Sequence, residues 1–123
     1  MNEEQFKRRT KDLALRVMKL INSLPQTTTA QVIGKQLLRS GTSVGANYRA
    51  ACRAKSTADI LHKLAIVEEE ADETLYWLEL LIEGEIVPES KLKNLITETN
   101  EITAMIVSSI KTLKNRQNNF NPK

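Results

Sequence analysis

Apolar residues recur along most of the chain at alternating spacings of three and four, the period that places side chains on one face of an α-helix. The pattern predicts helices over residues 3–23, 30–55, 57–83 and 89–115, with residues 116–123 as a frayed tail. Because the connections are short, consecutive helices should be antiparallel neighbours. We therefore expect residues 1–123 to form a single all-α domain, an antiparallel up-down-up-down four-helix bundle.

The second predicted helix is rich in small residues. Gly41 and Gly45 lie one turn apart, and Gly41 shares a face with Leu37 and Val44. A glycine inside a helix costs roughly 1 kcal/mol relative to alanine, so this spacing indicates a close approach by a neighbouring backbone or a large side chain. We expect this helix to lie flush along the third. The alternative is that Gly41 marks a helix end and a turn.

A polar seam is expected between the second and third helices. If they fold back at residue 56, positions equally far from that corner lie level, and Arg39 falls opposite Glu73. Ser43 and Asn47 would continue the seam. We interpret Arg39 and Glu73 as a partly buried ion pair that specifies register, since removing one member would leave a costly unpaired charge. Simple surface charges are the alternative.

Charge is distributed unevenly along the chain. Residues 57–85 hold nine acidic residues and one lysine, a net charge of −8; because the whole chain carries +3, the remainder carries +11. Most of this asymmetry should be neutralised between neighbouring helices. A basic surplus remains for a partner.

The basic residues gather on the polar face of the first helix and near the end of the second. Clustered cations bind phosphate backbones without base-reading motifs, although a solvated helix face is the commoner role, and the arginines could instead pair with third-helix acids. The candidate nucleic-acid-binding residues are Lys7, Arg8, Arg9, Lys11, Arg16, Arg49 and Arg53.

The carboxyl-terminal half of the third helix is apolar on more than one side. Trp77, Leu80 and Leu81 lie outside the row of apolar positions that should face the core of the bundle. We interpret these three residues as an oligomer interface. The alternative is that the first helix covers them within one subunit.

No constellation of residues indicates catalysis or a metal site. His62 is the only histidine, and we expect it to be solvated. Glu69 and Glu73 share a helical face, but salt bridging explains them more simply than a carboxylate dyad. Cys52 has no second cysteine for a disulfide, and its small neighbours indicate a buried free thiol. We expect a protein without enzymatic activity, cofactor or metal.

The amino-terminal residues are charged, and no run approaches the ~18 apolar residues of a membrane span. We therefore expect neither a signal peptide nor a spanning helix. The single cysteine favours a reducing, cytoplasmic location.

Residues 39–47 (RSGTSVGAN) and 70–78 (EADETLYWL) resemble a known four-helix bundle family. It includes the proteins encoded in intervening sequences of bacterial 23S rRNA genes, and the resemblance extends from Phe6 to about Leu113. It implies a bundle that often assembles as a ring of five subunits, a pentamer, with no established enzymatic activity. Many members carry the pattern Asn-x-x-Glu-Gly, where this chain has Ala50 and Ala51, so this end of the second helix is more basic.

A related branch resembles the accessory proteins of diversity-generating retroelements, which bind a reverse transcriptase and nucleic acid through a basic surface. We therefore predict a homo-oligomeric bundle that acts as an interaction module for RNA, DNA or a nucleic-acid enzyme. The alternative is a purely protein-binding scaffold with no nucleic-acid role.

Overall fold

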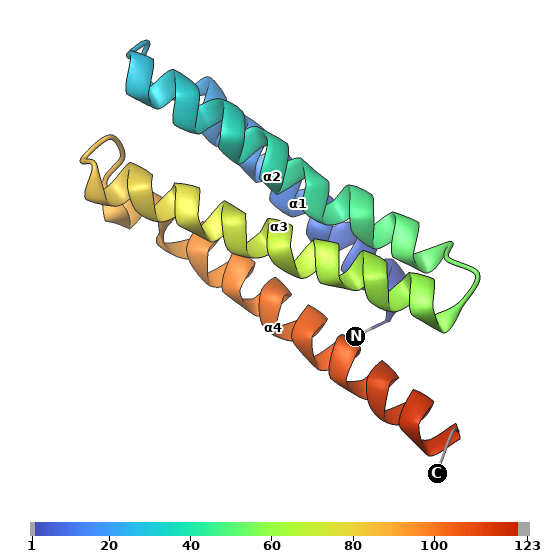
Figure 1. Cartoon of the computed structure of the whole chain (residues 1–123). Coiled ribbons are helices and arrows are strands. Elements are labelled where there is room, and N and C mark those ends of the chain that lie inside the picture. The colour runs from blue at the N-terminus through green and yellow to red at the C-terminus, as the bar shows by residue number, and fades with distance from the viewer. Residues whose placement is uncertain (1, 121–123) are drawn as a thin grey trace.

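The computed structural model describes residues 2–120, which form four α-helices. They are α1 (Glu3–Asn22), α2 (Thr28–Cys52), α3 (Thr57–Glu83) and α4 (Glu89–Phe120). Each helix runs antiparallel to the one before it, and α2 packs against both α1 and α3 (Figure 1). The predicted all-α four-helix bundle is confirmed.

Side-chain caps fix where the first three helices begin. The Asn2 side chain accepts from the Gln5 amide at 2.8 Å, and the Gln5 side chain accepts from the Asn2 amide, which completes a capping box. Thr27 caps α2, so this helix begins at Thr28, two residues before the predicted start. Ser56 accepts from the amide of Asp59 at 3.1 Å, so it caps α3. Each cap satisfies an amide that would otherwise lack a partner.

Two helix ends differ from the prediction. α2 stops at Cys52 rather than near residue 55, because Ser56 must be extended to cap α3 and the chain turns before it. α4 continues to Phe120, so the predicted fraying is wrong for residues 116–120. No glycine or proline interrupts the sequence between Glu89 and Phe120. The rest of the predicted tail, 121–123, lies outside the described residues.

The predicted apolar faces meet in one core. Four buried hydroxyl groups in this core each donate to a backbone carbonyl of the preceding turn, so burial leaves them hydrogen-bonded. These groups belong to Thr10, Ser40, Thr74 and Thr99. Side chains with at most 1% exposure include Leu13, Leu37, Val44, Val67, Leu78, Ile102 and Ile106.

The glycines of α2 face α1. A Cβ atom at Gly41 would lie 3.0 Å from Cγ2 of Val17, and one at Gly45 would lie 3.2 Å from Oγ1 of Thr10. α2 is helical through both positions, so the alternative of a turn at Gly41 is wrong. The close approach is present, but its partner is α1. α2 packs along α3 with a different face, which carries Ser40.

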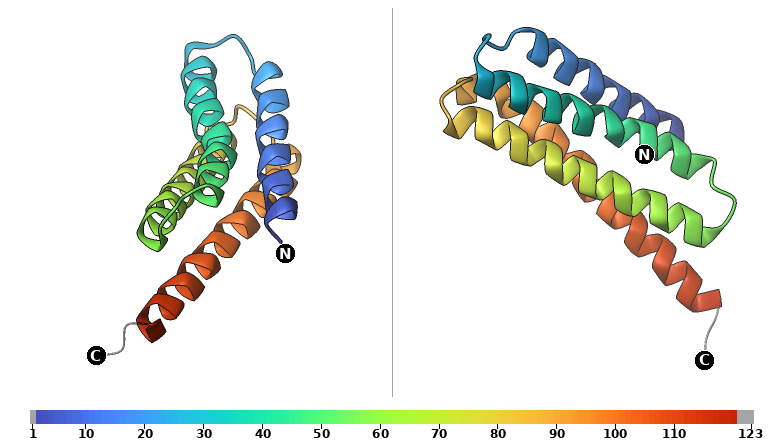
Figure 2. Two further views of the ribbon diagram at one scale, coloured as in Figure 1. Left: turned by 90° about the vertical axis from the view of Figure 1, so that its right-hand side faces the viewer. Right: turned by 45° about the horizontal axis from the view of Figure 1, so that its top comes forward.

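The two outer helices separate toward one end of the bundle. Figure 2 shows the carboxyl-terminal half of α4 running away from the start of α1. Within the described side chains, Ile106 is the last buried residue of α4. Ile110 and Leu113 are only partly buried. The end of α4 therefore has few neighbours in its own subunit.

Candidate functional site

Basic side chains from α1 and α2 line one groove of about 340 Å³. The antiparallel packing places the beginning of α1 beside the end of α2, so residues some forty positions apart in sequence share this groove. The lining residues are Glu4, Lys7, Arg8, Lys11, Arg49 and Arg53. We call this set the basic groove. It brings together five of the seven cations predicted to bind nucleic acid.

Some of these cations are already paired. The ammonium of Lys7 lies 3.3 Å from Glu3 and 3.5 Å from Glu4, and the hydrogen bond with Glu3 raises its pKa. Arg8 lies 3.7 Å from Asp12.

The other three cations of the basic groove are unpaired. Within residues 2–120, no acidic side chain forms an ion pair with Lys11, Arg49 or Arg53. The expected alternative, in which the two arginines pair with acids of α3, is therefore wrong. These three side chains are the strongest candidates for holding an external anion.

Arg9 does not belong to the basic groove. Its guanidinium makes a two-point contact with the Glu98 carboxylate, at 2.9 Å and 2.5 Å, and lies 3.0 Å from Glu101. It also donates to Sδ of Met105 at 3.2 Å. The hydrogen bond with Glu98 is the main reason that the pKa of Arg9 is raised. Arg9 therefore joins α1 to α4 and lies apart from the other predicted nucleic-acid-binding cations.

Arg16 also lies apart from the groove. It follows Arg9 by seven residues, or two helical turns, which places it on the side of α1 that faces toward α4. Its side chain is exposed and does not line the groove. Helical periodicity separates these two arginines from Lys7 and Lys11, although all four belong to the polar part of α1.

The Arg9 contacts predict a measurable role in holding α1 against α4. Arg9→Gln should lower the free energy of unfolding by roughly 1–2 kcal/mol, because it removes a mostly shielded two-point ion pair. Urea unfolding measures this loss. Arg8→Gln is the matched control; its side chain is 74% exposed, so its effect should stay within about 0.5 kcal/mol. Equal effects of the two substitutions would contradict this role.

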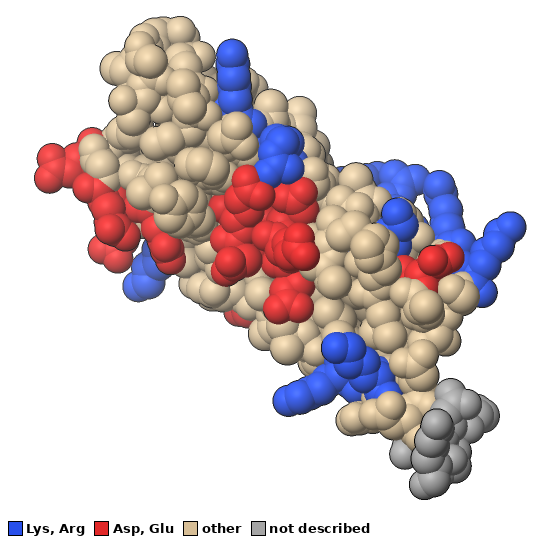
Figure 3. All heavy atoms as spheres, in the orientation of Figure 1, with Lys and Arg blue, Asp and Glu red and all other residues tan. Residues whose placement is uncertain are grey.

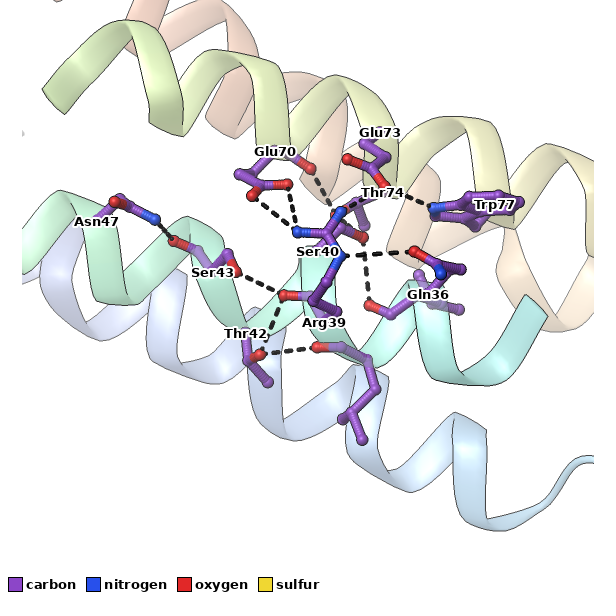
Figure 4. A network of polar contacts seen from close by, with 12 residues as sticks. Gln36, Arg39, Ser40, Thr42, Ser43, Asn47, Glu70, Glu73, Thr74 and Trp77 are labelled. Atoms are coloured by element: carbon purple, nitrogen blue, oxygen red, sulfur yellow. Dashed lines mark hydrogen bonds and ion pairs between the residues drawn. The ribbon is translucent and has the colours of Figure 1, made fainter. Parts of the chain in front are cut away.

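A second cluster joins α2 to α3 (Figure 4). The guanidinium of Arg39 lies between two carboxylates, 3.0 Å from Glu70 and in closer contact with Glu73. Nε1 of Trp77 donates to Glu73 at 3.2 Å. The Arg39–Glu73 pair lies where the register prediction places it. Its members are 48% and 34% exposed, so the pair sits at the surface of the interface rather than inside it.

The other two predicted members of the seam do not cross between the helices. The hydroxyl of Ser43 donates to the carbonyl of Arg39 at 2.7 Å, and Nδ2 of Asn47 donates to the carbonyl of Ser43 at 2.9 Å. Both bonds remain within α2. The polar contact beneath Arg39 comes instead from Ser40 and Thr74, whose buried hydroxyls lie 3.0 Å apart.

The Arg39 contacts predict a pH dependence of stability. Arg39 lowers the pKa of Glu73 below its usual 4.5, chiefly by hydrogen bonding. The stability gained from ionised Glu73 is therefore fully present above that usual value and is lost as the pH falls through the lowered one. The stability difference between the wild type and Arg39→Gln should be constant near pH 7 and shrink below about pH 4.5. Urea unfolding across this range measures it, and a difference that persists unchanged to about pH 3 would count against the pairing.

The predicted oligomer interface is only partly available. Leu81 has no exposed surface and belongs to the core of its own subunit, so including it was wrong. Trp77 and Leu80 are partly buried. Tyr76 is 54% exposed and packs edge to face on Trp77, with ring centroids 5.1 Å apart. The exposed part of this surface is therefore aromatic, and it adjoins the Arg39 cluster.

The remaining candidates for chemistry are dispersed. His62 and Glu69 are exposed, and Cys52 is half-buried, with its pKa raised mainly by burial. In the part of the chain that the structure describes, no three His, Cys, Asp or Glu side chains gather as metal ligands. Within residues 2–120, none of the helices combines the length and apolar character that a membrane span requires.

The charge separation predicted from sequence is visible on the surface. Figure 3 shows acidic side chains gathered over the middle of α3 and basic side chains at the end where α2 leads into α3. The exposed acids of α3 include Asp59, Glu69, Asp72 and Glu79. An anionic partner would therefore be repelled from α3 and attracted to the end that carries the basic groove.

A family model described as 23S rRNA-intervening sequence protein matches residues 2–108. The chain belongs to this family. The match to the 23S rRNA-intervening sequence proteins spans α1, α2, α3 and the first two thirds of α4. Both the basic groove and the Arg39 cluster lie within it. The part of α4 that leaves the bundle lies mostly beyond it.

A similar solved structure supports the fold assignment. It is the crystal structure of a protein of unknown function from the S23 ribosomal protein family of Bacteroides thetaiotaomicron. The two chains are 40% identical, with a TM-score of 0.84 over 90% of this chain and 99% of the other. No curated protein matches the sequence. These comparisons agree with a 23S rRNA-intervening sequence protein fold and assign no activity.

Proposed function

We propose that this protein is a non-enzymatic binding module that holds the phosphate backbone of RNA or DNA in the basic groove. The observation that supports this proposal is the convergence of cations from two helices on one groove, with Lys11, Arg49 and Arg53 unpaired within residues 2–120. Phosphate backbones bind clustered cations of this kind without regard to base sequence. The groove lining contains no aromatic side chain for stacking.

Fluorescence anisotropy with labelled RNA and DNA across a salt series tests this proposal. Binding through three phosphate contacts predicts that the logarithm of the association constant falls with the logarithm of salt concentration, with a slope of about −2 for a single strand. Different base sequences should bind equally well. Absence of binding at low salt would rule the proposal out.

The rival proposal is a protein-binding scaffold, and the exposed aromatic surface favours it. Tyr76 and Trp77 lie beside Arg39, and Tyr, Trp and Arg are the residues that most often dominate protein interfaces. The register set by Arg39 and Glu73 places Val32, which is 56% exposed, level with Leu80. This surface is a candidate for self-association, including the ring of five subunits that the family resemblance implies.

Light scattering after size-exclusion chromatography measures the subunit number. Self-association through this surface predicts that Tyr76→Ala and Trp77→Ala lower that number while Val107→Ala, an exposed apolar control on α4, does not. A protein enzyme that carries nucleic acid would fit both proposals. The resemblance to retroelement accessory proteins makes a reverse transcriptase the partner to test first, by titration in the same assay.

A further inference from the structure

The basic groove continues along α1 and α2 into an apolar section. Next to the cations, small side chains form the lining, including Ala14, Thr42 and Ala46. The close approach at Gly45 and Gly41 makes this section shallow, because the two helix backbones lie near each other. A ligand lying along the groove would therefore contact the cations at one end and a surface of methyl groups next to them.

Exposed apolar side chains follow on both walls. On α1, Met18 follows Ala14 by one turn and is 44% exposed. On α2, Leu38 precedes Thr42 by one turn and is 37% exposed. Gly41 lies against Val17, and this contact fixes how α1 is aligned along α2. Met18 and Leu38 therefore lie level with each other on the two walls of the groove. Leu38 also lines the next hollow along the same two helices. The residues that line both hollows belong to α1, α2 and the connection between them, so neither α3 nor α4 covers this side.

We propose that the groove takes a single strand of RNA or DNA whose unpaired bases lie on the apolar section while its phosphates contact the cations. This inference rests on the proposed nucleic-acid function. The cations require a polyanion, and the apolar surface beside them requires a ligand that also presents flat, weakly polar faces. Unpaired bases offer such faces, whereas a duplex keeps them stacked inside. The charge and the apolar character of one continuous groove therefore select single strands.

Fluorescence anisotropy tests the inference with a labelled strand of about twelve nucleotides and the duplex of the same sequence. The wild type should bind the single strand more tightly than the duplex. Met18→Gln with Leu38→Gln should weaken single-strand binding roughly five- to tenfold and leave duplex binding unchanged. Val107→Gln is the matched control, because Val107 is exposed to a similar degree on α4, outside both the groove and the aromatic surface. Both substituted positions are solvent-exposed, and circular dichroism checks that the variants fold.

The outcomes separate this inference from the function on which it rests. Equal binding of strand and duplex, or a double variant that weakens neither or both alike, would overturn the single-strand assignment and leave phosphate binding intact. No binding of either probe at low salt would overturn both proposals. A strand preference that disappears only in the Met18 and Leu38 variant would support the placement of the bases.

Discussion

Replacing Lys11, Arg49 and Arg53 with glutamate should lower the affinity for labelled RNA or DNA by roughly 100-fold or more at low salt. These three side chains are the unpaired cations of the basic groove, so each substitution removes an attraction and adds a repulsion. All three are exposed, and the helices should keep their content and melting temperature. Anisotropy at several salt concentrations measures the loss, together with a flattened salt dependence.

The matched control reverses three lysines elsewhere. Lys93, Lys111 and Lys114 lie exposed on α4, outside the groove, and their reversal changes the net charge by the same amount. This control should lose far less affinity, because local contacts rather than total charge hold the phosphates. Equal losses in the two triple variants would show that only net charge matters. Full affinity in the groove variant would show that another surface binds.

Gly41→Leu should lower the free energy of unfolding by roughly 3 kcal/mol. A Cβ atom at Gly41 would lie 3.0–3.3 Å from three side-chain atoms of Val17, so any side chain there meets the whole branched end of that valine. Val17 is fully buried and β-branched, and its χ1 angle is nearly fixed in a helix. The two helices must therefore move apart. Leucine has a high helix propensity, so the loss would report crowding rather than local helix weakening.

Gly34→Ala provides the contrast. A Cβ atom at Gly34 would meet the far end of Leu24 at 3.2 Å, and that flexible side chain can yield. The gain in helix propensity, up to about 1 kcal/mol, should then offset the crowding. Urea unfolding of both variants compares the two sites. Similar stabilities for Gly41→Leu and Gly34→Ala would mean that α1 and α2 do not approach each other as closely at Gly41 as the structure shows.

The candidate site was partly predictable because helical periodicity assigns each residue an angle around its helix. It placed Lys7 and Lys11 on the polar side of α1, and counting from the corner at residue 56 placed Arg39 opposite Glu73. The same reasoning could not distinguish Arg9 from its neighbours. Its partner Glu98 stands 89 positions away, and only the meeting of α1 and α4 reveals it.

Other members of the site were missed for an identifiable reason. Ser40 and Thr74 resemble ordinary small helix residues in sequence, yet their hydroxyls meet inside the α2–α3 contact. Ser40 and Thr74 lie at nearly equal distances from the corner at residue 56, as Arg39 and Glu73 do. The same count along the two helices could therefore have found this pair. Leu81 was placed on an interface because an apolar residue outside the main seam can face a partner subunit or its own core, and burial decides between the two.

The sequence by itself determined the four helices, the faces that meet in the core and the basic or acidic character of each. These properties depend on local hydrogen bonding and on a fixed helical period, which nearby residues specify. Only the tertiary structure decided that the glycines of α2 face α1, that Arg9 is bound to Glu98, and that α4 leaves the bundle after Ile106. The physical reason is that a helical period gives a direction around one helix, whereas the neighbour met in that direction depends on how all four helices pack.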